Sequence, residues 1–225
     1  MIWQDKGYLL NLNNYNENSS IAEFYTLYHG KKSGIIFGSS SKKNKSYLIL
    51  GNKMHLNYSS KNENTIGNFK IEIDKVNTAY FFDHRVKLNC ITYTLDLIRS
   101  MTAENLINKT IFDLLDIFFN NLHLDNWVDK FVLWELELFK SLGYEINYME
   151  YVKKKMVNNE YIYVLKNNEK RTVPNFLVEN FSEKIKKQDI ISGLKINGDF
   201  LDKTVIQINN EKILTLREEF IKLII

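Results

Sequence analysis

The chain has 225 residues, enough for one large domain or two small ones, and 44% of them are hydrophobic and 25% are charged. This composition is typical of a globular protein that folds throughout, and it excludes a disordered or fibrous chain. The net charge of +3 is unevenly placed, because residues 1–80 hold ten lysines and six acidic residues whereas residues 81–225 hold 20 basic and 21 acidic residues. The positive excess is therefore N-terminal.

The N-terminal sequence MIWQDKGYLLNLNNY lacks the basic start and apolar stretch of a secretory signal, and no apolar run approaches the ~18 residues of a membrane span. We therefore expect a cytoplasmic protein without membrane contact. Cys90 is the one cysteine, which excludes an intrachain disulfide and a cysteine-based zinc cluster. A lone cysteine within KLNCITYTL is expected in the core.

Short apolar runs separated by Asn, Gly, Ser and Lys clusters predict about five strands in residues 2–76. The runs are YLLNL, SIAEFYTLY, SGIIFG, KMHLNY and NFKIEIDKV. In the last run Phe69, Ile71 and Ile73 alternate with charged residues, as expected of a strand with one face in a core. Five short strands, with glycines spaced to allow sharp bends, predict a closed barrel of the oligonucleotide/oligosaccharide-binding (OB) type; an SH3-like barrel is the alternative.

The hydrophobic period changes from about residue 79. Apolar residues at helical spacing predict an amphipathic helix over about residues 107–122, with Thr102 as its N-cap. A second helix is predicted over residues 127–142, ending at Gly143, and its aromatic residues are expected in the core. Then EYIYVLKNNEKRTV predicts a hairpin around an Asn-Asn turn, followed by Pro174 and further helices.

These elements predict an α+β fold. A five-stranded OB-type barrel in residues 1–78 is expected to precede a mainly α-helical domain in residues 79–225, with a small hairpin near residues 156–173. The boundary near residue 78 depends on the change of period alone.

Motifs for catalysis and for metal binding are not found in the sequence. GSSSKKNK lacks the glycines and the Gly-Lys-Ser/Thr ending of a phosphate-binding loop, there is no Gly-x-Ser-x-Gly elbow, and the four histidines are scattered without ligand spacing. Glu135 and Glu137, two residues apart on a helix, are expected on different faces. The sequence therefore indicates binding rather than catalysis, without catalytic, cofactor-binding or metal-binding residues.

The candidate binding residues lie in a window without acidic residues, between Glu23 and Glu63. Its lysines are Lys31, Lys32, Lys42, Lys43, Lys45, Lys53 and Lys61. Such a window creates a local positive field that attracts polyanions, and Tyr28 and His29 beside the first lysines complete the candidate nucleic-acid-binding set. The alternative is that the lysines are solubilising tips of hairpin loops.

Five segments in this order resemble the bacterial RecO family of DNA repair and recombination mediators: WQDKGYLL, YHGKKSGIIFGSSSKK, LWELELFKSLGYEINY, LKINGDFLDK and LREEFIKLI. The resemblance spans nearly the whole chain. It implies an OB barrel, a helical domain and a small C-terminal hairpin region. It also implies a non-enzymatic cytoplasmic protein, nucleoid-associated when active, that binds single- and double-stranded DNA, anneals complementary strands, and acts with RecR to load recombinase onto strands coated by single-strand-binding protein.

Annealing brings two polyanions together, so lysines that neutralise phosphates without reading bases suit the implied function. Possible stacking partners in the same window are Tyr28, Phe37, Tyr47 and Tyr58, although barrel aromatics are more often core residues. The resemblance further implies a site on the helical domain for the acidic tail of single-strand-binding protein, with Arg99, Lys130 or Lys140 as candidate contacts.

Many members of the family carry a four-cysteine zinc site in the last third, but here Tyr151 stands where the first cysteine is expected. We expect no bound zinc, and we expect aromatic packing to hold the hairpin instead. The aromatic residues are Tyr148, Tyr151, Tyr161, Tyr163, Phe176 and Phe181.

Two other functions are compatible with the same residues. A single-stranded RNA-binding module in translation or RNA metabolism is one, since a barrel and lysines do not distinguish DNA from RNA. A non-catalytic adaptor that docks through its helical domain, with inert lysines, is the other.

Overall fold

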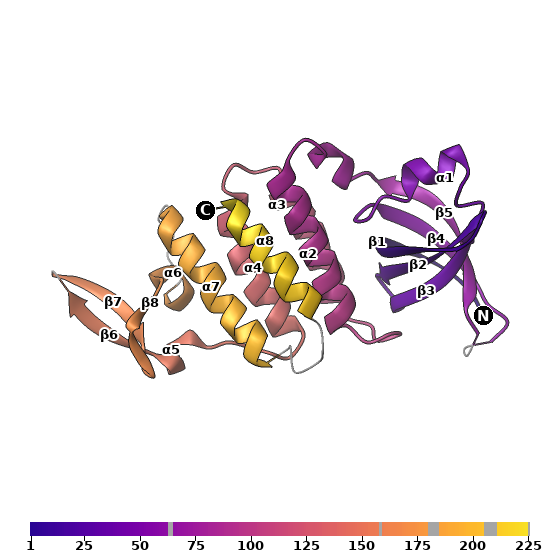
Figure 1. Ribbon diagram of the computed structural model, residues 1–225. Helices are drawn as coiled ribbons and strands as arrows, with labels where there is room; N and C mark the ends of the chain where they lie inside the picture. The colour runs from indigo at the N-terminus through magenta and orange to yellow at the C-terminus, as the bar shows by residue number, and fades with distance from the viewer. Residues whose placement is uncertain (63–64, 158, 180–184, 205–210, 225) are drawn as a thin grey trace.

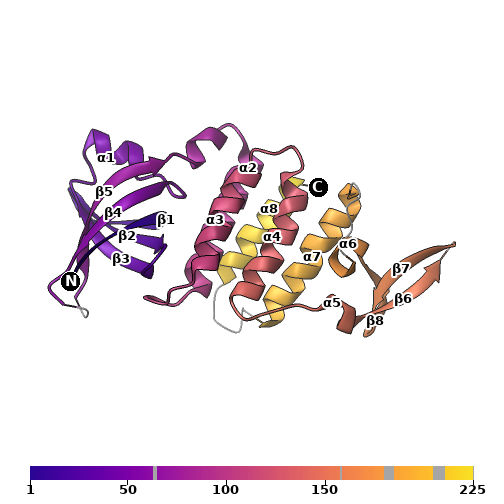
Figure 2. The same cartoon turned by 180° about the vertical axis from the view of Figure 1, so that it is seen from behind.

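The computed structural model describes residues 1–62, 65–157, 159–179, 185–204 and 211–224. The predicted α+β fold is confirmed. A closed barrel, a body of helices and a small sheet follow one another along the long direction of the molecule, with the barrel and the small sheet at opposite ends (Figures 1 and 2). No helix among these residues combines the length and the apolar character needed to cross a membrane.

The barrel contains five strands in the order β1-β2-β3-β5-β4, with β4 also paired to β1. The strands are β1 (Ile2–Asn16), β2 (Ser19–Thr26), β3 (Gly30–Phe37), β4 (Lys53–Ser59) and β5 (Gly67–Lys75). All pairings are antiparallel except β3 with β5, where Gly34 pairs with Gly67 and closes the barrel. This arrangement is OB-like, as predicted.

The closure of the barrel depends on small residues. A Cβ atom on Gly34 would lie 2.5 Å from the ring of Phe69, so only glycine lets the two strands approach here. The interior is apolar and includes Phe24, Ile36 and Met54, all nearly inaccessible to solvent. The alternation predicted for the last strand is confirmed: Phe69 is buried and Ile71 and Ile73 pack against the barrel core, whereas the charged residues between them are exposed.

Between β3 and β4 the chain forms α1 (Lys42–Tyr47), a short helix that the sequence did not indicate. The hydroxyl of Ser41 accepts a hydrogen bond from the Asn44 amide at 3.3 Å and caps the helix. Gly38 precedes it in the left-handed region, with φ of +68°. The lysines of this stretch therefore lie on a helix rather than in a loop.

The helical body is formed by helices whose inward faces share one apolar core. They are α2 (Arg85–Met101), α3 (Lys109–Asn121), α4 (Trp127–Ser141), α7 (Lys187–Thr204) and α8 (Glu211–Ile224), preceded by the single turn η1 (Thr78–Phe81). As predicted, α4 buries Phe131 and Trp134 and is followed by Gly143 with φ of +88°. Cys90 is buried in the same core.

The prediction that Thr102 caps the start of the next helix is wrong. Thr102 follows the end of α2, where its amide and its hydroxyl both donate to the Ile98 carbonyl, at 3.1 and 2.7 Å. The cap of α3 is Asn108. The reason is that residues 102–108 are held against the barrel by contacts distant in sequence, including a bridge between Lys31 and Glu104.

The small sheet has three strands, β6 (Val152–Val157), β7 (Glu160–Leu165) and β8 (Asn168–Val173), in that order. The predicted hairpin is β7 and β8, and its turn falls at Lys166 and Asn167. Short helices flank the sheet, α5 (Tyr148–Tyr151) before it and α6 (Asn175–Val178) after it. The strand β6 was not predicted, because three consecutive lysines interrupt its apolar pattern.

Only part of the aromatic packing expected around this sheet is observed. Tyr148, Tyr163 and Phe176 are buried, and the first two share a cluster with Ile196 of α7. Tyr151 and Tyr161 are each 56% exposed, so the expectation is wrong for them. Phe181 lies outside the described residues.

Candidate nucleic-acid interface

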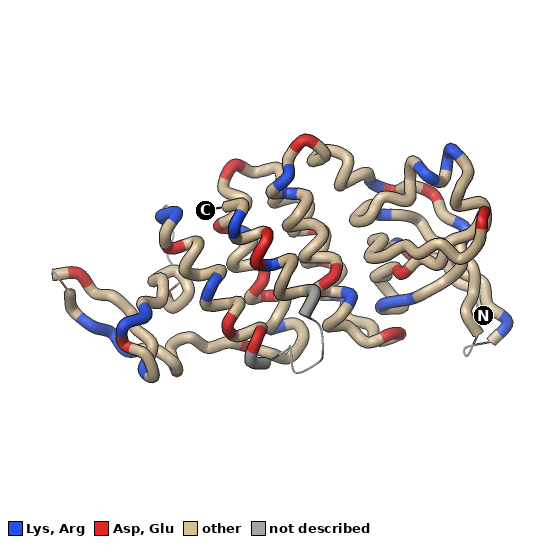
Figure 3. The backbone as a smooth tube through the Cα atoms, viewed as in Figure 1, with Lys and Arg blue, Asp and Glu red and all other residues tan. Residues whose placement is uncertain are grey.

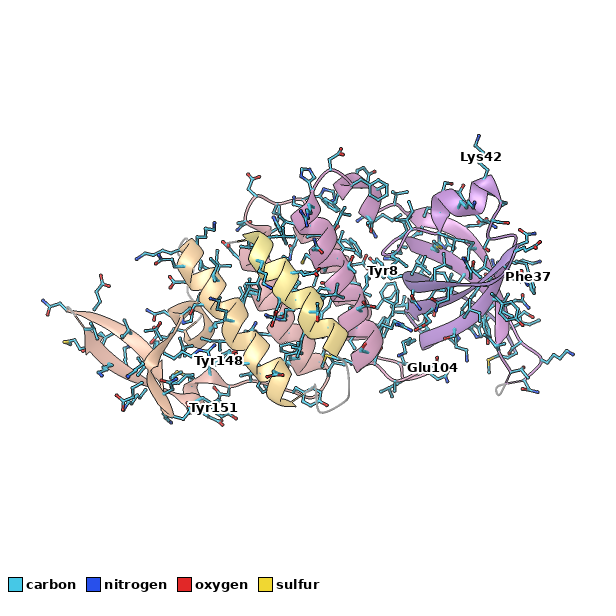
Figure 4. The ribbon with its side chains drawn as sticks, in the orientation of Figure 1. Tyr8, Phe37, Lys42, Glu104, Tyr148 and Tyr151 are labelled. Atoms are coloured by element: carbon cyan, nitrogen blue, oxygen red, sulfur yellow. The ribbon has the colours of Figure 1, made fainter. Side chains whose placement is uncertain are left out.

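Three of the predicted lysines lie together on α1. Lys42, Lys43 and Lys45 are exposed, and the helix carries no acidic residue. The Lys43 ammonium lies 6.0 Å from the centroid of the Tyr47 ring, which is half-buried. The lysines of α1 appear as blue segments of the tube in Figure 3, and Figure 4 shows that Lys42 points away from the barrel into solvent. This arrangement presents a compact positive surface to solvent.

A shallow pocket adjoins this helix, and the strand that precedes it ends in an exposed aromatic residue. Phe37, the last residue of β3, is 63% exposed at the outer side of the barrel, away from the helical body (Figure 4). A pocket of about 390 Å³ between β1, the start of β2 and α1 is lined mainly by polar side chains. Its lining includes Asn14, Ser20, Ser39, Lys45 and one acidic residue, Glu17. Amides, hydroxyls and a lysine suit a sugar-phosphate backbone better than an apolar ligand.

Lys31 and Lys32, on β3, contact the chain that follows α2. The Lys31 ammonium donates to the Arg99 carbonyl at 2.6 Å, and burial lowers the pKa of this lysine. The Lys32 ammonium donates to the Asn105 side chain at 2.7 Å and lies 5.4 Å from the Tyr58 ring centroid. Both lysines are half-buried and have partners within the molecule.

Lys53, at the start of β4, lies between the barrel and α3. Its ammonium donates to both oxygens of Asp116 at 2.8 Å. It also lies 5.3 Å from the Tyr8 ring centroid and 4.8 Å from that of Phe112. These contacts stabilise the junction between the barrel and the helical body. Because the Lys53 ammonium is already paired with Asp116, it is poorly available to an external ligand.

The remaining candidates lie apart from α1. Lys61 is exposed in the β4–β5 connection. Tyr28 is 55% exposed, with the Lys109 ammonium 5.4 Å from its ring centroid. His29 stacks on Trp3 with ring centroids 4.0 Å apart, and its Nδ1 lies 2.8 Å from an Asp5 oxygen.

The structure therefore divides the predicted set. It brings the three lysines of α1 together on the exposed side of the barrel, whereas Lys31, Lys32 and Lys53 contact the helical body or the chain that follows α2. Among the predicted stacking residues, Phe37 and Tyr28 are exposed and Tyr58, at 2% exposure, belongs to the barrel core. The sequence could not separate these roles, because the partners of the half-buried lysines lie more than 60 residues away along the chain.

Within the described ranges, no group of three or more His, Cys, Asp or Glu side chains is arranged to hold an ion. The exposed surface of α1 combines positive charge with the polar side chains of the adjoining pocket.

Comparison with known proteins places both halves of the chain in one family. Residues 1–74 match the family model described as Recombination protein O N terminal, and residues 84–184 match Recombination protein O C terminal. A protein named DNA repair protein RecO from Ehrlichia chaffeensis is 27% identical over 243 aligned residues, covering 100% of this chain and 98% of the relative. Another of the same name, from Rhodospirillum centenum, is 18% identical, covering 98% of this chain and 94% of the relative.

Proposed function

This chain belongs to the RecO family of DNA repair proteins, and from that premise we propose that it acts as a recombination mediator rather than an enzyme. In this role it binds single- and double-stranded DNA, anneals complementary strands and, with RecR, helps to load recombinase. The observation that carries the proposal is the exposed, acid-free helix α1 on an OB-like barrel.

The chemistry of annealing explains why such a surface suits this function. Two strands repel each other through their phosphates, so a mediator must neutralise charge while leaving the base edges free to pair. Lysines on mobile side chains do this without fixing a sequence or a geometry. An exposed ring such as Phe37 adds stacking that every base accepts.

The exposure of each candidate residue determines how directly we propose that it contacts DNA. Lys42, Lys43, Lys45 and Lys61 provide direct phosphate contacts, together with Tyr28. Lys31, Lys32, Lys53 and His29 have partners inside the molecule, so we expect them to contribute less to DNA binding than the exposed lysines do.

We predict that replacing Lys42, Lys43 and Lys45 together by Ala weakens binding to a single-stranded oligonucleotide by about tenfold, with little effect on stability. Fluorescence anisotropy measures the binding and thermal unfolding the stability. The matched control replaces Lys130, Lys140 and Lys222, three exposed lysines of the helical body, and changes the net charge equally. Equal affinities of the two variants would contradict the proposal.

Salt dependence gives a second measure of the same contacts. With four to six phosphate contacts, the slope of log K against log salt should be roughly −3 to −4, and the α1 variant should be shallower by about 2. Matched RNA and DNA oligonucleotides in the same titration test the choice of nucleic acid. Tighter binding of RNA would favour a role in RNA metabolism over DNA repair.

The helical body is the proposed docking region for the acidic tail of single-strand-binding protein. Arg99 already forms a two-point contact with Glu23 at 2.8 Å, and Lys140 pairs with Glu145 at 3.0 Å. Lys130, exposed on α4, is the remaining candidate cation. Calorimetry with a tail peptide tests this, and Lys130→Ala should weaken the binding while Lys222→Ala should not.

The zinc site that the family resemblance implies does not fit this chain. A structural zinc needs about four thiolate or imidazole ligands, and residues 143–200 contain neither Cys nor His. Tyr151, which stands where the first cysteine was expected, has an exposed ring. No step of the proposed function depends on a metal.

A further inference from the structure

The small sheet carries a local positive charge as large as that of the whole barrel region. Residues 152–173 contain six basic and two acidic residues, a net charge of +4, although residues 81–225 together sum to −1. The sheet lies at the end of the molecule opposite the barrel, and lysine positions run along β6 in Figure 3. The net charge of residues 81–225 therefore does not reveal the local positive charge of the sheet.

The lysines of β6 are presented to solvent on both faces of an edge strand. Lys153, Lys154 and Lys155 are all exposed, and β6 pairs on one side only, with β7. Consecutive residues of a strand point to opposite faces, so Lys154 lies on the face of its partner Tyr163 while Lys153 and Lys155 lie on the other. A single lysine is enough to protect a sheet edge from pairing. Three in a row provide charge beyond that need.

Exposed aromatic rings lie among these charges. The Lys154 ammonium lies 4.9 Å from the centroid of the Tyr161 ring, and Tyr161 and Tyr151 are each 56% exposed. Met156, directly opposite Tyr161 on β6, is 58% exposed. Figure 4 shows Tyr148 and Tyr151 beside the sheet, on the α5 segment that precedes it. On the Lys154 face, therefore, a cation lies beside an open ring at the exposed edge of the sheet, and this combination suits single-stranded nucleic acid.

Nearby carboxylates reduce the charge of the surface without cancelling it. Arg171 pairs with Asp199, and when Glu179 and Asp199 are included the count is six basic and four acidic residues, a net charge of +2. Glu169 pairs with Lys153 and with Lys155, and Glu179 lies 3.3 Å from Lys154. All these ion pairs are solvent-exposed and contribute little to stability, so phosphate groups can displace them. The charge that remains favours a polyanion over an acidic peptide, because the rings offer a partner for bases as well.

We propose that the free edge of β6 is a second binding surface for single-stranded nucleic acid, with Lys154 and Tyr161 on one face of the sheet and Lys153 and Lys155 on the other. This inference rests on the proposed function for its biological meaning, because one chain with binding surfaces at both ends can hold two strands at once. The barrel surface on α1 and the sheet surface are separated by the helical body (Figure 1). Two strands bound to the same protein molecule have a high effective concentration relative to each other, which favours their pairing.

Four proteins test the two surfaces separately. They are the unmodified chain, a barrel variant (Lys42, Lys43 and Lys45 to Ala), a sheet variant (Lys153, Lys154 and Lys155 to Ala) and the combination of both. Binding of labelled oligothymidylate and oligouridylate of about 15 nucleotides is measured by anisotropy, with the fold checked by circular dichroism. We expect each triple variant to retain weakened binding and the combination to lose at least about tenfold more than either.

Each outcome bears on one surface. If the sheet variant binds like the unmodified chain and the combination like the barrel variant, the second surface is wrong while the barrel proposal stands. If the barrel variant is unaffected and the sheet variant loses binding, the barrel proposal is wrong and the proposed sheet surface stands. Sheet-dependent binding to phosphatidylglycerol vesicles without binding to either oligonucleotide would overturn the inference in favour of a membrane contact.

A substitution of Tyr161 tests the surface without changing its charge. Tyr161→Ala should weaken oligonucleotide binding by about threefold or more in the barrel-variant background, and Tyr161→Trp should restore it, because a larger ring stacks at least as well. The salt slope should stay the same in both. If Tyr161→Ala has no effect in this background, the tyrosine does not contact the strand and the inference fails.

Discussion

Glu135 is the most deeply buried carboxylate of the helical body, and its neighbours satisfy its charge. Arg217 donates to both of its oxygens at 2.7 and 3.2 Å, and Tyr93 donates to one of them at 2.7 Å. Asn197 adds a donor at 3.0 Å. Burial and the charge of Glu135 raise the pKa of Tyr93 well above its ordinary value. The group thus connects α2, α4, α7 and α8 through one carboxylate.

We predict that Arg217→Met destabilises the protein by about 3–5 kcal/mol, because it leaves Glu135 charged and unpaired in the core. Urea unfolding followed by circular dichroism measures the change. The double variant Arg217→Met with Glu135→Leu serves as the control and should cost clearly less, since it removes both charges. A single variant as stable as the unmodified chain would contradict this interpretation.

The ion pair of Glu135 and Arg217 shows what can be predicted from the sequence at the scale of single residues and what cannot. The spacing of Glu135 and Glu137 predicted different helix faces, and this is confirmed, since Glu135 is buried and Glu137 is exposed. Nothing local identified Arg217, which lies 82 residues away. Spacing along a helix tells which face a residue occupies, but a buried charge finds its partner only through packing.

At the scale of elements, an ion pair joins β2 to the C-terminal turn of α2. Arg99 donates to both oxygens of Glu23, and Asn11 donates to one at 2.9 Å. Burial opposes ionisation of Glu23, but the hydrogen bonds from Arg99 and Asn11 outweigh it and lower the pKa of the carboxyl below its ordinary value of 4.5. The ionised form therefore favours the folded state.

The pH dependence of this contact follows from the sign of the shift. Because the folded pKa is depressed, the stabilisation is present above pH 4.5 and is lost as the pH falls through the folded pKa. The unmodified chain should lose free energy of unfolding between pH 6 and about pH 3 as Glu23 is protonated. We predict that this loss is smaller in the Glu23→Gln variant, which has no carboxyl at this position. Urea midpoints at both pH values measure it. An unchanged difference would show that Glu23 does not contribute.

Local patterns predicted some elements and failed for others. The strand β5 and the end of α4 at Gly143 were found, because alternation and an αL glycine are local signals. The helix α2 was missed, since its Ile91, Thr92, Tyr93 and Thr94 favour strands, and packing in the core overrides that preference. The short helix α1 depends on a cap and a turn that read as a loop in the sequence.

Hydrophobic burial should hold the small sheet without a metal. Its buried cluster consists of Tyr148, Val152, Tyr163, Val173 and Ile196, and the burial of each side chain contributes about 2 kcal/mol. We predict that EDTA leaves the melting temperature unchanged, whereas Tyr148→Ala lowers it. A marked fall with EDTA, together with stoichiometric zinc by elemental analysis of untagged protein, would contradict this account.

At the scale of the whole molecule, the barrel and the helical body share a core. Tyr8 and Tyr25 of the barrel belong to the same buried cluster as the helices, and Tyr8 stacks on Phe119 with ring centroids 5.6 Å apart. Figure 4 shows Tyr8 on the side of the barrel that faces the helices. The Tyr25 hydroxyl donates to the Asn108 carbonyl at 3.1 Å, and burial raises the pKa of Tyr25 to about 12. Gly30 approaches so closely that a Cβ would lie 2.3 Å from the Leu106 carbonyl oxygen.

This shared core predicts that the barrel and the helical body unfold together. Among the three tryptophans, Trp3 packs against the barrel core, whereas Trp127 and Trp134 lie in the helical body. In a variant with Trp127→Phe and Trp134→Phe, fluorescence reports the barrel and the circular dichroism of helices reports the body. The two urea transitions should have the same midpoint, because neither part can release the other without exposing Tyr8 and Tyr25. Separate midpoints, with the barrel unfolding first, would mean that the junction is too weak to couple them. In that case the two proposed strand-binding surfaces would be carried by independent units rather than held by one cooperative body.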